Sequence, residues 1–416
     1  MTPRILVAGG GIGGLACALA LARGATGAAA DRGPEAVPRP IHAPRPHIDL
    51  LEQADAFGEV GAGLQLGPNA TRRLHALGLK EALAGIAAVP EALVVRGTGG
   101  DGVVARLPLG ESMHRRYGAP YCCVHRADLH ALLLDAVRGS DGTTLHLGAR
   151  IERIETRGES VHVASADGRG WSGDALIGAD GLWSAVRSHV TGPADPAPRV
   201  TGHTAWRALV PQAALPAALR GDDVRVWLGA RLHAVAYPVR GGAALNVVVL
   251  AESAPAGDAR DWDQATGLDA LQRATGRCGG MLQALIEAMP GWRAWTLCDR
   301  APLAGPAAMA RGRIALAGDA AHPMLPYMAQ GAGMAIEDAV ALAGTLGAGS
   351  GTTAADVPAA LSRYAAARWQ RNARVQARAR RNGVVFHLAG PARLARDAGL
   401  RALGPRLLDV PWLYAG

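Results

Sequence analysis

Lysine is almost absent from this 416-residue chain, because Lys80 is the only one among 43 basic residues. A Walker-type phosphate loop needs a Gly-Lys-Ser/Thr sequence, and a pyridoxal enzyme needs a lysine for its Schiff base. Lys80 lies in Gly78-Leu79-Lys80-Glu81, which suits neither class. The same lysine cannot complete the Tyr-x-x-x-Lys pair of the short-chain dehydrogenases, so this third class is excluded as well.

Cysteine and histidine are present, but not in the usual metal-binding or nucleophilic patterns. The five cysteines contain no C-x-x-C pair and their number is odd, which argues against a disulfide scaffold and a structural zinc site and favours a reducing cytosol. The thirteen histidines form no H-E-x-x-H, and no G-x-S-x-G is present, which excludes zincins and hydrolases with a nucleophile elbow. We therefore expect no metal site.

Long apolar runs are also missing. Residues 5–22 form an uncharged stretch that superficially resembles a secretory signal. Its five glycines would break the helix that such a signal needs, at a cost of about 1 kcal/mol each. No other uncharged apolar run reaches the roughly 18 residues that span a bilayer. We therefore expect a soluble cytoplasmic protein without a transmembrane segment.

The chain begins with a strand, a glycine-rich turn and a helix. Ile5–Ala8 is typical of a buried parallel strand, and Leu15–Ala22 of the helix that follows it. Gly24–Pro46 is rich in Ala, Gly, Pro and Arg, which neither continue a helix nor join a sheet, so we interpret it as a surface insertion. His47–Glu52 then supplies a second strand, which ends in an acid. This order is typical of a doubly wound sheet.

Later segments divide the chain into three regions. Ala175–Gly178 and Gly312–Ala317 again have the pattern of buried strands, whereas Val200 to about Leu297 is β-rich with regular turns. The sequence predicts an α/β fold with a discontinuous Rossmann-like βαβ domain (1–198 and 299–346) and an inserted mixed or antiparallel β-sheet domain (199–298). The remainder (347–416) is predicted to be a C-terminal helical region.

The first turn contains a dinucleotide-binding fingerprint, Gly9-x-Gly11-x-x-Gly14. The first glycine makes the turn, the second lets the backbone approach a pyrophosphate, and the third lets helix and strand pack closely. The fingerprint also expects an acid about 20 residues later, which binds a ribose hydroxyl. Asp31 has the better spacing, but only Glu52 ends a strand, and removal of the insertion restores its spacing. We therefore assign the ribose to Glu52.

Two further segments indicate the kind of dinucleotide protein. Residues 174–187 are DALIGADGLWSAVR, and residues 312–326 are GRIALAGDAAHPMLP. Together with the N-terminal fingerprint, and in this order, they resemble the three signatures of the class A flavoprotein monooxygenases. The resemblance covers nearly the whole chain, including His125-Arg126-Ala127-Asp128-Leu129, and is closest to the salicylate hydroxylase and 3-hydroxybenzoate 6-hydroxylase branch.

The resemblance implies noncovalent FAD, with a FAD-binding Rossmann-like domain and a substrate domain. It implies that Glu52 binds the adenosine ribose and that Arg126 binds the flavin side chain and phosphates. It also implies that Asp180 contacts the region shared by flavin and nicotinamide, and that Asp319 binds the ribityl hydroxyls. The loop beside the flavin pyrimidine ring would run from Pro326 to Met334, with Gly331 and Gly333, before a helix whose positive end faces the flavin. Many relatives have Asn in place of Gly333, so only backbone donation is expected there.

His233 and Tyr237 are four residues apart on a predicted strand, so their side chains share one face. The resembling branch has a His and a Tyr at this spacing near the substrate phenol, which implies that His233 is the catalytic base and that Tyr237 assists it. The alternative is that both are half-buried strand residues with satisfied polar tips. Arg207, after Trp206, is either a ligand for a substrate carboxylate or a surface arginine.

The resemblance implies an aromatic hydroxylase that consumes NADH or NADPH and O2. Hydride would pass to the flavin, O2 would add as a C4a-hydroperoxide, and one oxygen would pass to a small aromatic acid of the hydroxybenzoate or salicylate type. No second G-x-G-x-x-G of the chain lies between a strand pattern and a helix pattern, as the fingerprint requires, which fits a nicotinamide that meets the flavin domain itself. A flavin-dependent reductase or epoxidase for an isoprenoid or other non-phenolic substrate would share the FAD signatures, and it predicts an apolar tunnel without a role for His233.

Seven arginines and no acid lie between Arg363 and Arg381, and five of them fall near one helix face. Such a stripe can bind phosphate polymers or anionic lipid, or a partner of a non-catalytic flavoprotein. The aromatic residues and fold signatures of nucleic-acid modules are missing. We therefore expect no nucleic-acid partner and a solvated or subunit-facing helix, which is compatible with a homodimer. The sequence leaves the oligomeric state, the ring, the position hydroxylated and the nicotinamide open.

Overall fold

A computed structural model describes residues 3–24, 45–58, 61–346 and 353–416. The predicted insertion Gly24–Pro46, with Asp31, lies outside the described residues except at its ends. Among the helices of the described ranges, none is both long and apolar enough to cross a membrane.

The N-terminal strand lies inside a six-stranded sheet with the order β18-β19-β11-β1-β2-β7. These strands are β1 (Arg4–Ala8), β2 (His47–Leu51), β7 (Thr143–His146), β11 (Ala175–Gly178), β18 (Ala310–Arg311) and β19 (Ile314–Leu316). All pairs are parallel except that of β18 with β19. Ile5, Leu6 and Val7 are completely buried, as expected for a strand covered on both faces. The predicted α/β fold with a Rossmann-like sheet is confirmed.

The helix after β1 is the centre of a helical layer on this sheet. α1 (Ile12–Arg23) packs against α6 (Arg126–Arg138) and α10 (Gly331–Leu346), and its residues are buried almost all round. A Cβ on Gly13 would lie 3.4 Å from the Cβ of Ala335, so the glycine lets α1 and α10 approach closely. α3 (Pro68–Ala76) packs on α10, α4 (Lys80–Ile86) packs on α3 and α6, and α5 (Gly110–Tyr117) packs on α3. α7 (Ala185–Thr191) instead contacts β11 and β19.

The second large sheet has eight strands in the order β16-β17-β12-β15-β14-β13-β4-β5. They are β4 (Ala92–Gly97), β5 (Val103–Pro108), β12 (Arg199–Pro211), β13 (Val224–Leu228), β14 (Leu232–Val239), β15 (Ala244–Glu252), β16 (Gln264–Thr266) and β17 (Trp292–Asp299). β4 and β5 come from outside the predicted range 199–298, and β4 pairs with β13 in parallel. All other pairs are antiparallel.

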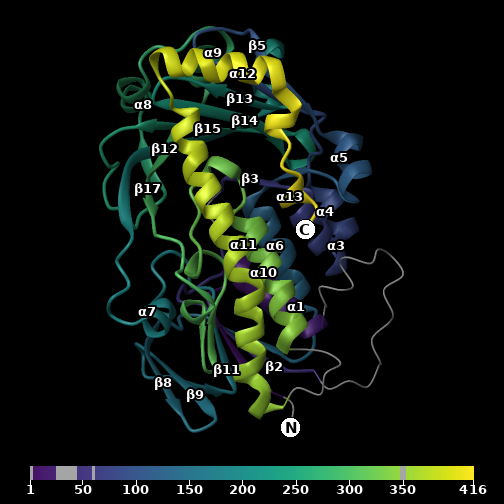
Figure 1. The fold of residues 1–416 in the computed structure, drawn as a ribbon, viewed down its shortest axis with the longest axis vertical. Coiled ribbons are helices and arrows are strands. Elements are labelled where there is room, and N and C mark those ends of the chain that lie inside the picture. The colour runs from purple at the N-terminus through teal and green to yellow at the C-terminus, as the bar shows by residue number, and fades with distance from the viewer. Residues whose placement is uncertain (1–2, 25–44, 59–60, 347–352) are drawn as a thin grey trace.

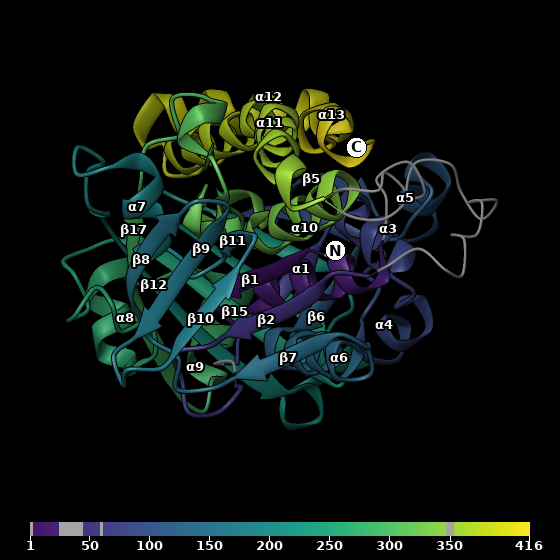
Figure 2. The same ribbon diagram turned by 90° about the horizontal axis from the view of Figure 1, so that it is seen from below.

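The two faces of this sheet have different partners. Trp206, Trp227 and Val247 pack with α8 (Leu268–Thr275) and α9 (Gly280–Ala288). On the other face, Tyr237 shares a cluster with Met334 of α10, so this face is turned toward the first domain. Two small sheets complete the fold. One consists of β8 (Ile151–Arg157), β9 (Ser160–Ser165) and β10 (Gly170–Gly173), and the other of β3 (Gly63–Leu66) and β6 (Cys122–His125). Figure 2 shows β8 and β9 beside the six-stranded sheet.

The C-terminal region consists of α11 (Val357–Phe386), α12 (Gly390–Leu408) and α13 (Pro411–Tyr414). In Figure 1, α11 runs alongside both parts of the molecule, and α12 crosses over the eight-stranded sheet. The predicted solvated stripe on α11 needs a correction. Arg371 forms an ion pair with buried Glu337, and Arg374 lies 3.9 Å from the ring centre of Trp412, so part of the stripe faces the protein.

Candidate functional site

The fingerprint glycines form a turn that has no room for side chains. Gly9 has a φ of +101°, and a Cβ there would lie 2.5 Å from the carbonyl oxygen of Ala179. A Cβ on Gly14 would lie 1.8 Å from the carbonyl oxygen of Gly9. Gly11 is the N-cap residue of α1 and has no capping side chain. The first N–H groups of α1 can therefore bind a phosphate, as the fingerprint requires.

Glu52 follows β2 and lies directly beside this turn. Its Oε2 accepts the N–H of Gly10 at 2.5 Å, and its Oε1 accepts the N–H of Ala54 at 2.8 Å. His130, which the sequence analysis did not single out, contacts the carbonyl oxygen of Gly10 through Nε2 at 2.8 Å. A strand end thus holds the carboxylate where an adenosine ribose would approach the turn, which supports the choice of Glu52.

We expect Glu52→Ala to weaken FAD retention markedly, because the substitution removes the carboxylate beside the fingerprint turn. The matched control is Asp31→Ala, which should leave retention unchanged. The measurement is flavin absorbance per chain after extensive desalting. Loss of FAD only in Asp31→Ala would show that the wrong acid was assigned to the ribose.

Asp180 follows β11, and its carboxylate caps α7. Ser184 donates to Oδ1 at 2.5 Å, and the N–H groups of Ala185 and Val186 donate to Oδ2 at 2.8 and 3.1 Å. Burial raises the pKa of Asp180, and these three hydrogen bonds oppose the rise. The carboxylate is therefore held in one orientation at the start of α7. The backbone of Asp180 lies beside the fingerprint turn, since a Cβ on Gly9 would lie 3.0 Å from the Cα of Asp180.

Arg187 links the two later signatures, a role that sequence reasoning missed. Its buried guanidinium donates to the carbonyl oxygens of Ala320 and Ala321 at 3.0 and 2.9 Å. The same group forms an ion pair with Asp195 at 2.8 Å. The position of Arg187 at the end of the DALIGADGLWSAVR segment was a signal that could have identified it.

Asp319, Gly331 and Gly333 lie around the N-terminus of α10. Asp319 is exposed, and a Cβ on Gly331 would lie 3.8 Å from its Oδ1. A Cβ on Gly333 would lie 3.2 Å from Oε1 of Gln330 and 3.7 Å from Nδ2 of Asn69. These two amides hydrogen-bond to each other at 3.1 Å, so polar side chains are present beside Gly333 although it has none.

Arg126 and Arg207 both lie near the ring of Trp262. Arg126 begins α6 and its guanidinium lies 4.5 Å from the ring centre of Trp262, whereas Arg207 lies 6.0 Å from it. Arg207 is buried and forms an ion pair with Asp263. The surface-arginine alternative for Arg207 is therefore wrong, and a protein carboxylate already binds its guanidinium.

His233 is buried at the centre of an aromatic and histidine cluster. Its Nδ1 lies 2.9 Å from Nε2 of His387, and its ring centre lies 5.2 Å from that of Tyr327 and 5.4 Å from that of Phe386. Burial, followed by the neighbouring imidazoles of His387 and His203, lowers the pKa of His233 well below its usual value. His233 is therefore a neutral imidazole at pH 7, with a lone pair that can accept a proton.

Tyr237 lies on the same face of β14 but has other neighbours. Asn246 is opposite it on β15, and a Cβ on Gly63 would lie 2.8 Å from its hydroxyl oxygen. Burial raises the pKa of Tyr237, so the phenol keeps its proton and can act as a hydrogen-bond donor. The structure thus brings His233 close to Pro326–Met328 and to the end of α11, and Tyr237 close to β3.

Sequence reasoning missed His387 and Tyr327 as neighbours of His233. Tyr327 follows Pro326 in the predicted flavin loop, so its position was available. His387 is 154 residues from His233, and no local pattern connects them. Burial, with smaller contributions from His203 and Arg396, lowers the pKa of His387 to about 4, so this imidazole is also neutral at pH 7.

Comparison with known proteins agrees with this geometry. The model of the FAD binding domain family matches residues 2–379. The chain belongs to this family. It is 38% identical to 3-hydroxybenzoate 6-hydroxylase from Polaromonas naphthalenivorans (strain CJ2), over 99% of this chain and 95% of that protein.

Two solved structures are similar over nearly the whole length. Klebsiella pneumoniae HpxO in complex with FAD and uric acid has a TM-score of 0.81 and 28% identity, covering 98% of this chain and 95% of that one. A salicylate hydroxylase substrate complex has a TM-score of 0.79 and 25% identity, covering 100% and 96%. The protein is a flavoprotein monooxygenase of this family with FAD as its cofactor. The cramped glycine turn, Glu52 and the N-termini of α1 and α10 fit that cofactor.

Proposed function

We propose that the protein hydroxylates an aromatic acid of the hydroxybenzoate or salicylate type, with NADH or NADPH and O2 as co-substrates. The single observation that carries this proposal is the buried neutral imidazole of His233 on the sheet face beside Tyr327. Deprotonation of a phenol makes its ring carbons more nucleophilic, so a base in a dry site is what the protein must add. The names of the relatives, which are hydroxylases of aromatic acids, support the same substrate class.

In this proposal each residue binds, orients or holds a proton. FAD, when bound, takes electrons from NAD(P)H and activates O2. Glu52, Arg126, Asp180 and Asp319 orient it, together with the glycine turn and the Pro326–Met334 loop. His233 accepts the phenolic proton at Nε2, because its Nδ1 faces His387. Tyr237 donates a hydrogen bond that orients the substrate, and its buried surroundings exclude water.

The alternative is a reductase or epoxidase for an isoprenoid or other non-phenolic substrate. Such an enzyme would not need the two imidazoles on the eight-stranded sheet, where Nδ1 of His233 lies 2.9 Å from Nε2 of His387. Burial of unneeded polar rings costs free energy unless their hydrogen bonds are satisfied. The imidazole pair and the named relatives therefore favour hydroxylation of an aromatic acid over this alternative.

We infer that the three regions predicted from the sequence have separate roles, and that residues 92–108 belong with the second region. Residues 1–198 and 299–346 would bind FAD, residues 199–298 would bind the substrate, and residues 347–416 would cover both. The pairing of β4 with β13 adds residues 92–108 to the substrate sheet.

A panel of aromatic acids tests the proposal most directly. We expect a hydroxybenzoate-type acid to accelerate NAD(P)H oxidation and to gain one oxygen, or to lose CO2 if attack occurs at the carboxyl-bearing carbon. The measurement combines nicotinamide absorbance with product mass, and benzoate without a hydroxyl group serves as the matched control. Acceleration that yields only H2O2 for every acid would mean that these compounds are effectors, and the proposal would fail.

A further inference from the structure

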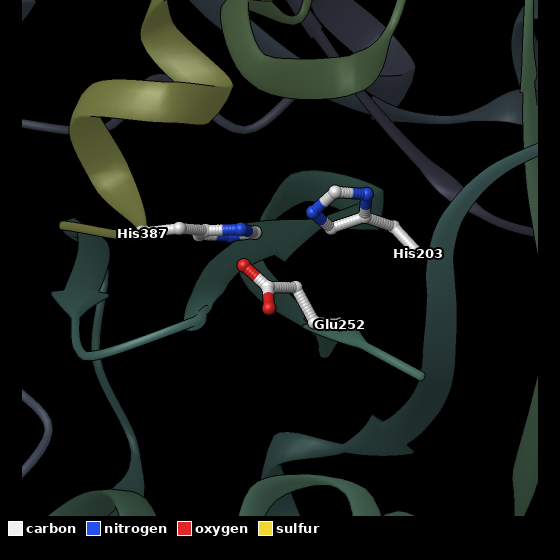
Figure 3. A group of neighbouring side chains, drawn as sticks. All are labelled: His203, Glu252 and His387. Carbon is white, nitrogen blue, oxygen red and sulfur yellow. The ribbon is translucent and has the colours of Figure 1, made fainter. Parts of the chain in front are cut away.

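Three side chains from distant parts of the chain converge at the end of α11. His203 belongs to β12, Glu252 ends β15, and His387 is the C-cap residue of α11. One potential ligand atom from each lies within 4.8 Å of the other two. Figure 3 shows the two imidazole rings pointing toward each other, with the Glu252 carboxylate directed at the space between them.

The backbone holds these three residues in place. His203 and Glu252 are paired across β12 and β15, so their side chains leave the sheet on the same face. Arg231, in the turn before β14, donates its N–H to the carbonyl oxygen of His387 at 3.0 Å and accepts the N–H of Glu252 at 3.0 Å. Strand pairing therefore positions His203 and Glu252, and backbone hydrogen bonds of the Arg231 turn position His387 beside them.

Both imidazoles have a nitrogen available for a ligand. Nδ1 of His203 lies 3.1 Å from the carbonyl oxygen of Thr201, which can only accept, so Nδ1 carries the proton and Nε2 has a free lone pair. Nε2 of His387 faces His233, whereas its Nδ1 is buried and has no hydrogen-bond partner within the described residues. His387 is only 7% exposed, and an unsatisfied buried polar atom is unfavourable.

We propose that His203, Glu252 and His387 bind a divalent metal ion of the Zn²⁺ type, which would link the end of α11 to the substrate sheet. Two imidazoles and one carboxylate are a typical ligand set for Zn²⁺ and leave a position for water. Ligand atoms around Zn²⁺ are at most about 4.2 Å apart, twice the usual bond length, so the cluster must contract slightly. Glu252 is exposed and can rotate toward the ion, and its exposure also gives the ion access from solvent.

The ion would also affect His233, a consequence that rests on the proposed function. An ion on Nδ1 of His387 leaves the ring proton on Nε2, which then donates to Nδ1 of His233. The proton of neutral His233 would in turn lie on Nε2, the nitrogen proposed to accept the phenolic proton. Zn²⁺ should therefore slow oxygen transfer while leaving FAD binding unchanged.

The direct test uses tag-free, FAD-loaded protein that is treated with a chelator and then dialysed against Zn²⁺. We expect about one Zn²⁺ per chain by elemental analysis, and a higher midpoint of thermal unfolding, because the ion binds only the folded chain. Glu252→Gln and His203→Asn should each lose more than about 100-fold in affinity, beyond the loss seen for outer-shell partners. His114→Asn, an exposed histidine outside the cluster, is the matched control and should bind normally.

The outcomes separate this site from the proposed function. Failure of the wild-type protein to bind Zn²⁺ stoichiometrically, or equal binding by wild type and Glu252→Gln, would overturn the metal site. FAD content shows that each variant is folded, and Glu252 is exposed, so loss of binding by Glu252→Gln supports the site. Binding without any inhibition would leave the metal site intact and count against His233 as the base.

Discussion

His233→Ala should slow oxygen transfer to the aromatic substrate by about 100- to 10,000-fold while FAD binding is retained. His233 contacts His387, Tyr327 and Phe386, and it is not among the residues around the fingerprint turn. A phenol with a pKa near 10 is mostly neutral at pH 7, so the reaction benefits from a base that removes its proton. Flavin reduction by NAD(P)H needs no such base, so that half-reaction should be unchanged.

The measurement is the hydroxylation rate after preformed reduced enzyme is mixed with O2 and substrate. We also expect more NAD(P)H to be lost to H2O2, because the activated oxygen then decays before transfer. The matched control is His162→Ala, a histidine on β9 in the small three-stranded sheet. If His233→Ala leaves the transfer rate and the coupling ratio unchanged, His233 is an ordinary buried strand residue.

The pH dependence gives an independent check on the same base. Burial, the largest cause, and the neighbouring imidazoles lower the pKa of His233 well below 6.5. A base with a lowered pKa stays neutral, and therefore active, as the pH falls through the range where an ordinary histidine becomes protonated. The transfer rate should therefore show no decline near pH 6.5. A decline centred there would indicate an exposed histidine as the base.

Tyr237→Phe should lower the transfer rate in the same direction but less. Its phenol keeps its proton because burial raises its pKa, so it can orient the substrate and cannot act as the base. The substitution removes only the hydroxyl oxygen, which lies so close to Gly63 that a Cβ there would be 2.8 Å from it. Single-turnover rates at saturating and at subsaturating substrate concentrations separate an effect on substrate orientation from an effect on substrate binding. A loss as large as that of His233→Ala would show that Tyr237 does more than orient the substrate.

The parts of the site that are local in sequence could be predicted, and the parts that depend on distant pairing could not. Gly9, Gly14 and Glu52 follow from one βαβ unit, whose strand, turn and helix each have a clear pattern. The pairing of β4 with β13 joins segments about 130 residues apart, and nothing within β4 indicates its partner. The contact between His233 and His387 has the same origin, since the end of α11 reaches the eight-stranded sheet only in the folded chain.

Charge patterns were misleading for a related reason. The stretch from Arg363 to Arg381 contains no acid, so a solvated face was the natural interpretation of its arginines. Two of them, Arg368 and Arg371, have their partners on α10, where Glu337 and Asp338 are buried. A sequence shows that a helix carries charge on one face, but the element that packs against that face is set by the tertiary fold.

Arg368→Met should destabilise the folded protein by about 3–5 kcal/mol, because it leaves buried carboxylates without their partner. Arg368 is only 8% exposed, and its guanidinium lies 2.7 Å from Oε2 of Glu337 and 2.8 Å from Oδ1 of Asp338. Asp338 also accepts hydrogen bonds from the N–H of Gly318 at 3.1 Å and from His322 at 2.5 Å. The ion pair therefore supports the loop that carries Asp319, and FAD retention should fall together with stability.

The acid sensitivity of the variant should change as well. Burial alone would raise the pKa of Glu337, but Arg368 and Arg371 hold it at about 2, below its ordinary value of 4.5, and the pKa of Asp338 is lowered as well. Carboxylates with lowered pKa values stabilise the fold fully above their unfolded pKa, and that contribution is lost as the pH falls through the folded pKa. Wild-type stability should thus decline between about pH 4.5 and 2, and loss of Arg368 should move the decline to higher pH.

Urea unfolding at a series of pH values, followed by flavin fluorescence and circular dichroism, measures both effects. The matched control is Arg363→Met, an exposed arginine on the same helix, which should change the free energy of unfolding by less than about 0.5 kcal/mol. Arg368→Lys should fall between the two, because a lysine keeps the charge but cannot reach both carboxylates with one planar group. Equal stability of Arg368→Met and Arg363→Met would mean that Arg371, Asn372 and His322 hold Glu337 and Asp338 without it.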